Sequence, residues 1–272
     1  MIILSPKYSF SVPIDAESIT PDAFLGKSVG EVSSLPIWEG NRRRALGELF
    51  KIECDEGNEE AVTIRMIGDF AKVKRIGARM SCGLIVIEGS VGMRLGEGMR
   101  GGEITVKGDA DSWVGMMMKG GRIEVSGNAG DYIGSSYRGS IKGMKDGAIV
   151  VRGNAGVEAG CFMNGGLIRV GGKAEQFVGM HMRGGTILIE GDAGERVGAE
   201  MVGGTVIVLG QVPSVLPGFI VDGVRTRARV GEERVNGPFY LFKGDVAESW
   251  NGSLYVSVDR NPHLKVYESK IA

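Results

Sequence analysis

A glycine-rich unit of 19 residues repeats seven times between residues 68 and 210. Three uninterrupted copies are GDADSWVGMMMKGGRIEVS (108–126), GKAEQFVGMHMRGGTILIE (172–190) and GDAGERVGAEMVGGTVIVL (191–209). The copies open at Gly68, Gly89, Gly108, Gly127, Gly153, Gly172 and Gly191. A period of this length predicts stacked units, each of which buries its apolar side only against its neighbours.

The residue types at fixed positions of the repeat indicate strands and corners. We count the opening glycine as position 1 and leave out two extra residues in the first copy and seven in the fourth. Positions 8 and 14 are then glycine in all seven copies, so either φ is positive there or a Cβ has no room. Positions 16 and 18 are apolar in every copy while position 17 varies, which is the alternation of a half-buried strand. No copy has helical periodicity. We therefore predict a mainly β chain, a right-handed parallel β-helix of about seven coils with glycines at the corners.

The flanks of the repeat are not repetitive and are predicted to cover its open ends. The predicted units are an N-terminal cap with lead-in strands (1–67), the β-helix (68–210) and a C-terminal cap (211–272). Within the caps, Thr20-Pro21 predicts a helix start, and 46–54 and 237–272 are predicted as strands. The fourth copy carries seven extra residues, which we place at 139–145; insertions in such stacks often lie on the contact face.

Composition narrows the class of protein. The net charge is −1, so no overall field favours a nucleic acid or a membrane surface. The three cysteines form no CxxC pair, which is typical of a reducing compartment. The first residues contain no apolar run of signal-peptide length. We expect a cytoplasmic protein with no nucleic-acid or membrane partner.

A methionine column at position 11 is open to two interpretations. Methionine thioethers bind soft metals, but stacked copies also place like residues on like, and methionine fills cores adaptably. We favour core packing. The column comprises Met80, Met99, Met118, Met163, Met182 and Met201, with Tyr137 in the fourth copy.

Position 12, the next residue, is basic in four copies and is predicted to form an exposed stripe. The stripe is either a solvated face or a docking surface for an acidic partner or ligand. Its candidate binding residues are Arg100, Lys119, Arg138 and Arg183.

The side chains that usually carry catalysis are scattered. His181 and His263 are the two histidines, too few for a zinc site, and no base accompanies Cys82 or Cys161. No GxxxxGK[ST] loop occurs, and no glycine motif opens a helix after a strand. We therefore predict no catalytic residue, no metal ligand and no bound cofactor in this chain. Trp113, Tyr132 and Phe177 share position 6, a possible contact ladder if the chain is a free-standing binding module.

The repeat G-x-A-G-x-x-V-G-x-x-M-x-G-G-x-I-x-V resembles the glycine-repeat β-helix domain at the C-terminal end of glutamate synthase, over residues 68–209. The flanks narrow the resemblance. AESITPDAFLGKS, a WEGN turn, LGELF, seven coils and a short cap look like the C subunit of formylmethanofuran dehydrogenase. Bacterial formyltransferase/hydrolase complexes carry a similar subunit.

This resemblance implies a supporting role in a complex of methanogenic one-carbon metabolism. The complex reduces CO2 to formate at a tungsten- or molybdenum-pterin centre supplied by Fe–S clusters, and condenses formate with methanofuran at a dinuclear metal site. The implied partners are a metal-pterin subunit, an amidohydrolase-like subunit and ferredoxin-like subunits. The implied role of this chain is a scaffold between the catalytic subunits, and the acidic tail of methanofuran is a ligand that the basic stripe could guide.

Overall fold

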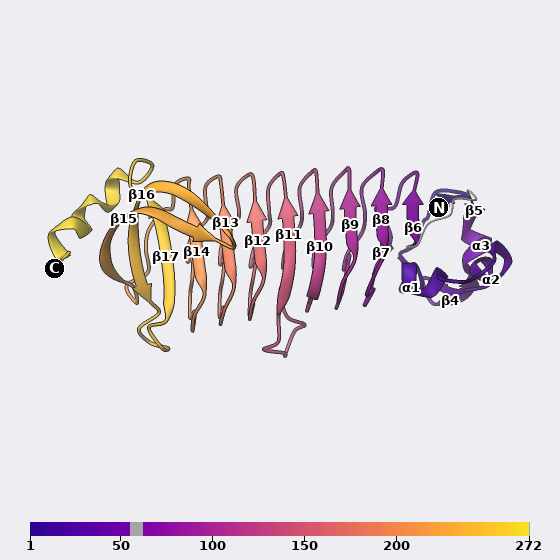
Figure 1. Ribbon diagram of the computed structural model, residues 1–272, viewed down its shortest axis with the longest axis horizontal. Coiled ribbons are helices and arrows are strands. Elements are labelled where there is room, and N and C mark those ends of the chain that lie inside the picture. The colour runs from indigo at the N-terminus through magenta and orange to yellow at the C-terminus, as the bar shows by residue number, and fades with distance from the viewer. Residues whose placement is uncertain (55–61, 272) are drawn as a thin grey trace.

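The computed structural model describes residues 1–54 and 62–271, and most of its strands lie in one sheet (Figure 1). The sheet has 13 strands in the order β15-β16-β17-β14-β13-β12-β11-β10-β9-β8-β6-β1-β5. From β6 to β14 every pairing is parallel. The prediction of a mainly β chain is thus confirmed, with a large parallel sheet at its centre. The strands from β6 to β14 are β6 (Thr63–Met66), β8 (Leu84–Ile87), β9 (Glu103–Val106), β10 (Lys119–Val125), β11 (Asp146–Val151), β12 (Leu167–Val170), β13 (Thr186–Ile189) and β14 (Thr205–Val208).

Each copy of the repeat, here called a coil, contributes one strand that includes its positions 15–18. Neighbouring coils stack in the predicted register, for example Ile123 beside Ile104 and Val125 beside Val106. Position 3 forms a second line of single parallel bridges, which runs from Phe70 to Ala193. The same-position stacking therefore extends beyond the sheet to another side of the coil.

Both glycine columns are explained by the backbone. Positions 8 and 14 have positive φ in all seven coils, for example 64° at Gly96 and 85° at Gly121. Space is lacking as well: a Cβ at Gly96 would lie 2.5 Å from the Cδ1 atom of Ile123, and one at Gly121 would lie 2.7 Å from the Cε atom of Met99. Both reasons that the sequence left open apply together.

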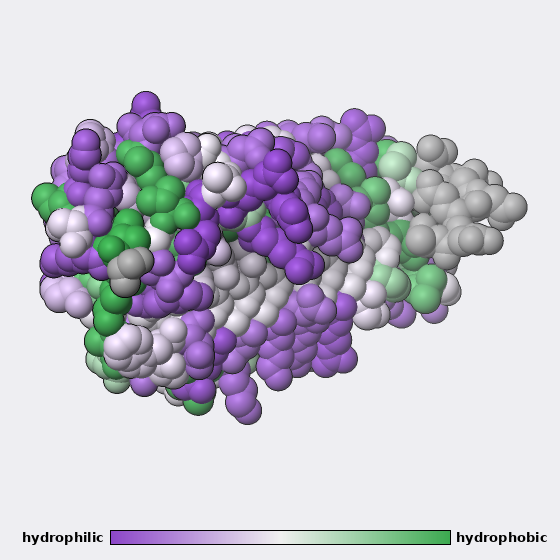
Figure 2. Space-filling view, turned by 60° about the vertical axis from the view of Figure 1, so that its left-hand side comes forward, coloured by the Kyte–Doolittle hydropathy of each residue, from purple (hydrophilic) through white to green (hydrophobic). Residues whose placement is uncertain are grey.

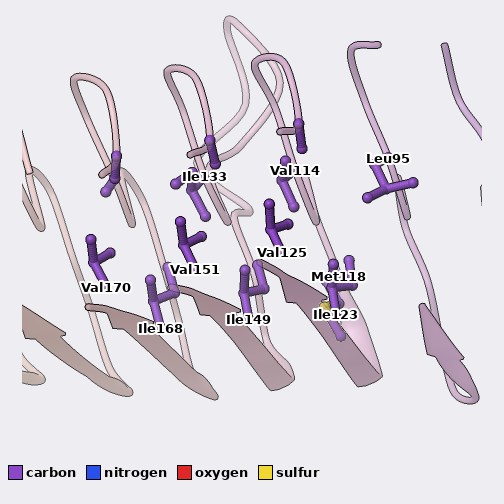
Figure 3. Packing of buried hydrophobic residues seen from close by; sticks show 14 of the residues in the cluster. Leu95, Val114, Met118, Ile123, Val125, Ile133, Ile149, Val151, Ile168 and Val170 are labelled. Atoms are coloured by element: carbon purple, nitrogen blue, oxygen red, sulfur yellow. The ribbon is translucent and has the colours of Figure 1, made fainter. Parts of the chain in front are cut away.

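The core runs along the inside of the coils (Figure 3). Positions 7, 11, 16 and 18 point inward, as Val114, Met118, Ile123 and Val125 do in the third coil, and all four side chains are fully buried. Figure 3 shows the same arrangement repeating along the stack, so that each aliphatic side chain meets its equivalents in the coils before and after. Burial of this apolar surface is what holds one coil to the next.

The N-terminal region closes one end of the stack. β1 (Ile2–Pro6) adds to β6 in parallel and pairs with β5 (Phe50–Cys54) in antiparallel. A second sheet has the order β4-β3-β2-β7. Its strands are β2 (Ile14–Asp15), β3 (Pro36–Glu39), β4 (Arg42–Ala45) and β7 (Val73–Lys74).

Three short helices lie in this region: α1 (Pro21–Phe24), α2 (Val29–Ser33) and α3 (Leu46–Leu49). The predicted helix start is confirmed, with Thr20 as N-cap accepting from the N–H of Ala23. The predicted strand over 46–54 is wrong in its first half, which is α3. The Glu48 carboxylate accepts the Ala45 N–H at 2.7 Å, and this capping contact favours a helical turn there.

The C-terminal region extends the sheet and then folds over it. β17 (Gly252–Ser257) pairs with β14 in parallel, and the long hairpin of β15 (Ile220–Val230) and β16 (Glu233–Gly244) follows it in the sheet order. The predicted strands are confirmed as far as residue 257, but Pro262–Lys270 forms a 3-10 helix. In Figure 1 the hairpin lies across β13 and β14, and on the face shown in Figure 2 hydrophilic rows run along the stack on either side of a near-neutral band.

Candidate interaction surface

The methionine column is part of the core, as predicted, except in the fourth coil. Tyr137 was assigned to this column, but its side chain is 52% exposed and Met144 takes the buried place instead. The hydrogen bonds show why. Met118 N–H donates to Gly115 O at 3.0 Å in the third coil, and Met144 N–H makes the equivalent bond to Gly134 O at 2.9 Å.

The inserted residues are therefore 137–143, and the placement at 139–145 is wrong. Ser136 still stacks in the ordinary way, because its N–H donates to Cys161 O at 3.2 Å. The regular coil resumes at Met144. Between them the sequence YRGSIKG leaves the stack as a loop, here called the insertion loop.

This shift changes one member of the basic stripe. Lys145, not Arg138, occupies position 12 of the fourth coil, since its N–H donates to Met118 O at 2.8 Å just as Lys119 N–H donates to Met99 O. Arg138 lies in the insertion loop. The corrected stripe stacks exposed side chains in coils two to six, in the order Arg100, Lys119, Lys145, Asn164, Arg183. Among the described residues no carboxylate lies within ion-pair distance of these four cations.

A second set of outward side chains stands at positions 6 and 10. Both positions have positive φ in nearly every coil, so they mark two more corners of the turn. At position 6 Trp113 stacks on Tyr132, with ring centroids 4.8 Å apart and planes at 17°. At position 10 Phe162 stacks on His181, with centroids 4.5 Å apart and planes at 11°. The predicted position-6 ladder is thus a real contact between two of its three rings, while Phe177 instead lies under the guanidinium of Arg196.

The two aromatic pairs and the insertion loop enclose a pocket of about 290 Å³, here called the loop pocket. Position 6 supplies one wall, position 10 the other, and the loop covers one side. Ser136 and Cys161 lie on its floor, and both are buried. The lining residues are Trp113, Tyr132, Ser135, Ser136, Tyr137, Arg138, Gly139, Ser140, Glu158, Cys161, Phe162, Met180 and His181.

The titratable groups of the loop pocket are not arranged for nucleophilic catalysis. Burial, with Glu158 beside it, raises the pKa of the Cys161 thiol to about 12, so the thiol is protonated at neutral pH. His181 Nδ1 lies 3.4 Å from Glu200 Oε2 and its ring is held by Phe162. His263 lies in the C-terminal 3-10 helix, far along the chain from His181.

Residues 1–54 and 62–271 contain neither a metal-ligand cluster nor a membrane-spanning helix. No group of three or more His, Cys, Asp or Glu side chains there is placed to hold a metal ion. None of the helices in the same residues is both long and apolar enough to cross a bilayer.

One solved structure matches nearly the whole chain. A chain in the crystal structure of the formyltransferase/hydrolase complex (FhcABCD) from Methylorubrum extorquens, in complex with methylofuran, superposes with a TM-score of 0.83 at 30% identity. The match covers 94% of this chain and 99% of that one. The chain belongs to the same family as this chain of the formyltransferase/hydrolase complex.

Curated relatives match over a shorter stretch. The C subunit of the molybdenum-containing formylmethanofuran dehydrogenase 1 from Methanosarcina barkeri is 45% identical over 93 residues, which are 34% of this chain and 31% of that protein. The C subunit of the tungsten-containing enzyme 2 from Methanothermobacter marburgensis is 46% identical over 94 residues, 34% of each chain. The aligned part thus spans about a third of these relatives. No family model matches the chain.

Proposed function

We propose that this chain is a structural subunit of a formylmethanofuran dehydrogenase complex, which reduces CO2 and formylates methanofuran, and that it holds the catalytic subunits in register. The observation that carries the dehydrogenase assignment is the identity of about 45% to C subunits of formylmethanofuran dehydrogenases. The role as a complex subunit is supported by the match over 94% of the chain to a chain of a formyltransferase/hydrolase complex. The fold supports it, because the residues that recur in every coil are used for packing and turns. What varies from coil to coil faces outward.

In this proposal the chain has no active site of its own. The tungsten- or molybdenum-pterin, the Fe–S clusters and the dinuclear metal site belong to a metal-pterin subunit, ferredoxin-like subunits and an amidohydrolase-like subunit. The names of the relatives support a molybdenum or tungsten enzyme. The described residues offer no metal-binding group that fits any of these centres.

The second candidate is the equivalent subunit of a bacterial formyltransferase/hydrolase complex. It is favoured by the match that spans the whole chain, whereas the dehydrogenase subunits match over about a third. Both candidates are scaffolds and differ in the enzyme that they support.

We infer that the stack is a right-handed parallel β-helix over residues 68–210, with caps at 1–67 and 211–272. Two lines of parallel pairing support this, one through the strands and one through position 3, together with same-position hydrogen bonds around each coil. A stack of this kind is rigid along its length, as a scaffold between two active sites requires.

Affinity purification of the tagged chain from its native host tests the proposal. The account predicts co-purification of the pterin and amidohydrolase subunits, with molybdenum or tungsten and iron in stoichiometric amounts. Recovery of a formyltransferase without these metals would establish the bacterial form instead. A chain recovered alone would contradict both.

The basic stripe is proposed to guide an acidic ligand or partner. Reversing Arg100 and Lys119 to glutamate is expected to raise the apparent KM for the furan-type formyl carrier while the complex still assembles. Arg227→Glu, on the exposed side of the hairpin, is the matched control. An unchanged KM in an intact complex would rule out the stripe as a guide.

A further inference from the structure

The coils around the loop pocket differ from the other coils in the residue types at positions 6 and 10. At positions 6 and 10 the first two coils and the seventh carry Arg75, Arg79, Arg94, Arg196 and Glu200, with Gly98. Aromatic side chains are confined to coils three to six, on both sides of the insertion loop. Because φ is positive at position 6 in all seven coils and at position 10 in six of them, whether or not a ring is present, the turn itself does not require a ring.

The insertion loop is fixed at its base rather than hanging free. Met144 N–H closes it onto Gly134 O, and Gly143 N–H donates to Phe162 O at 3.0 Å. Its tip still presents large apolar side chains to solvent, since Tyr137 and Ile141 are each 52% exposed. The loop therefore holds exposed apolar surface in a defined place beside the pocket.

Two arginine side chains lie near the aromatic rings of the pocket. The Arg94 guanidinium lies 6.0 Å from the Trp113 ring and 5.7 Å from the Tyr137 ring. Arg138 is exposed and has no ion pair with any described residue. The one carboxylate among the residues that line the pocket, Glu158, lies beside the Cys161 thiol. The mouth of the pocket thus favours an apolar group with a negative charge next to it.

The size and composition indicate a protein segment rather than a small molecule. A volume of about 290 Å³ is below the usual range for a small-molecule site, roughly 300 to 1,000 Å³, but fits one large side chain. Tryptophan, tyrosine and arginine are the residues that dominate binding at protein interfaces. Lys145 of the stripe comes two residues after the loop, and its N–H donates to Met118 O, next to Lys119 of the coil before. The basic surface therefore continues from the pocket.

We propose that the loop pocket is the main docking site for another subunit of the complex, and that it receives an extended segment with an aromatic or large aliphatic side chain flanked by an acidic residue. The apolar side chain enters between the Trp113–Tyr132 and Phe162–His181 pairs. The acidic residue meets Arg138. This inference rests on the proposed role as a complex subunit and names the surface through which that role is performed.

The test uses the full complex, purified through a tag on this chain. Trp113→Ala, Tyr137→Ala and Arg138→Glu are each expected to weaken the partner at least tenfold, with the other subunits lost on size-exclusion chromatography. Phe177→Ala, a ring at position 6 outside the pocket, is the matched control and should retain them. Thermal unfolding of each isolated variant close to wild type shows that the fold is intact.

A photo-crosslinking residue in place of Tyr137 identifies the occupant. The expected product joins it to a peptide of another subunit that contains an apolar side chain next to Asp or Glu. Unchanged affinity in all three variants, or a pocket that instead holds a small aromatic compound while assembly is normal, would overturn the inference and leave the scaffold role standing. A wild-type chain that binds no subunit at all would overturn the scaffold role itself.

Discussion

Two outward regions of the stack carry apolar side chains, and the chain covers only one of them. At position 17 of the sixth and seventh coils Leu188 and Ile207 point away from the core, yet both are fully buried beneath the β15–β16 hairpin, against Phe239 and Val230. At positions 6 and 10 of coils three to six the rings of the loop pocket remain half-buried, and Tyr137 is exposed. The same repeat therefore produces a surface that the chain buries by itself and a surface that we expect another chain to bury.

The largest expected effect on stability is at the covered surface. Leu188→Ala removes a fully buried side chain from under the hairpin, and we expect a loss of about 3 kcal/mol in unfolding free energy. Val86→Ala, at the same position of the first coil, where no hairpin lies, should cost about 1 kcal/mol. Guanidinium denaturation measures both. Equal losses would mean that the hairpin adds no burial.

A smaller effect is expected at the uncovered rings. Trp113→Ala removes the stacking on Tyr132, for which we expect about 1 kcal/mol in the isolated chain. Thermal unfolding of the isolated chain checks this value. A loss as large as that of Leu188→Ala would show that the ring belongs to the folded core and would remove the distinction between the two regions.

Removal of the insertion loop should change stability least. Joining Ser136 to Met144 restores the 19-residue period, and the bond from Met144 N–H to Gly134 O is already that of an ordinary coil. We expect unfolding within about 1 kcal/mol of wild type, because a seven-residue loop costs little to close, together with loss of the partner. Its denaturation curve and its co-purification report the two results separately. An unfolded deletion variant, or one that assembles normally, contradicts the account.

The reactivity of the Cys161 thiol measures how well the pocket floor is shielded from solvent, and it needs no variant of altered stability. With its pKa raised to about 12 by burial, Cys161 is thiolate to the extent of about one part in ten thousand at pH 8. The exposed Cys82 should therefore react with iodoacetamide much faster, and labelling of Cys161 should rise about tenfold per pH unit towards 12. Peptide mass spectrometry follows both. Similar rates at pH 8 would show that the pocket floor is open to solvent.

The repeat predicted most of the fold because each regular position has one physical use. Gly121 needs a positive φ and no Cβ, Ile123 fills the core, and both recur every 19 residues. Period alone did not locate the insertion within its coil, so Tyr137 was assigned to the place of Met144. The Met-Lys-Asp-Gly order at 144–147, which matches Met118-Lys119-Gly120-Gly121 in its first two residues and its last, was the available signal.

The cover over Leu188 and the loop pocket were harder to foresee. Both depend on contacts between segments far apart in sequence, such as Leu188 with Phe239. The rings at position 6 were noted, but position 10 was not considered with them. Only the pocket lining of the folded chain shows that the two rows stand on either side of one loop.

Hydroxyl-radical footprinting of Tyr137 tests the central claim most directly, because it compares the isolated chain with the assembled complex on the same side chain. The account predicts strong oxidation of Tyr137 in the isolated chain and several-fold protection in the complex, while Phe177 and the hairpin-covered Leu188 react alike in both. Equal oxidation of Tyr137 in the two states would contradict the claim that this uncovered surface is where the partner docks.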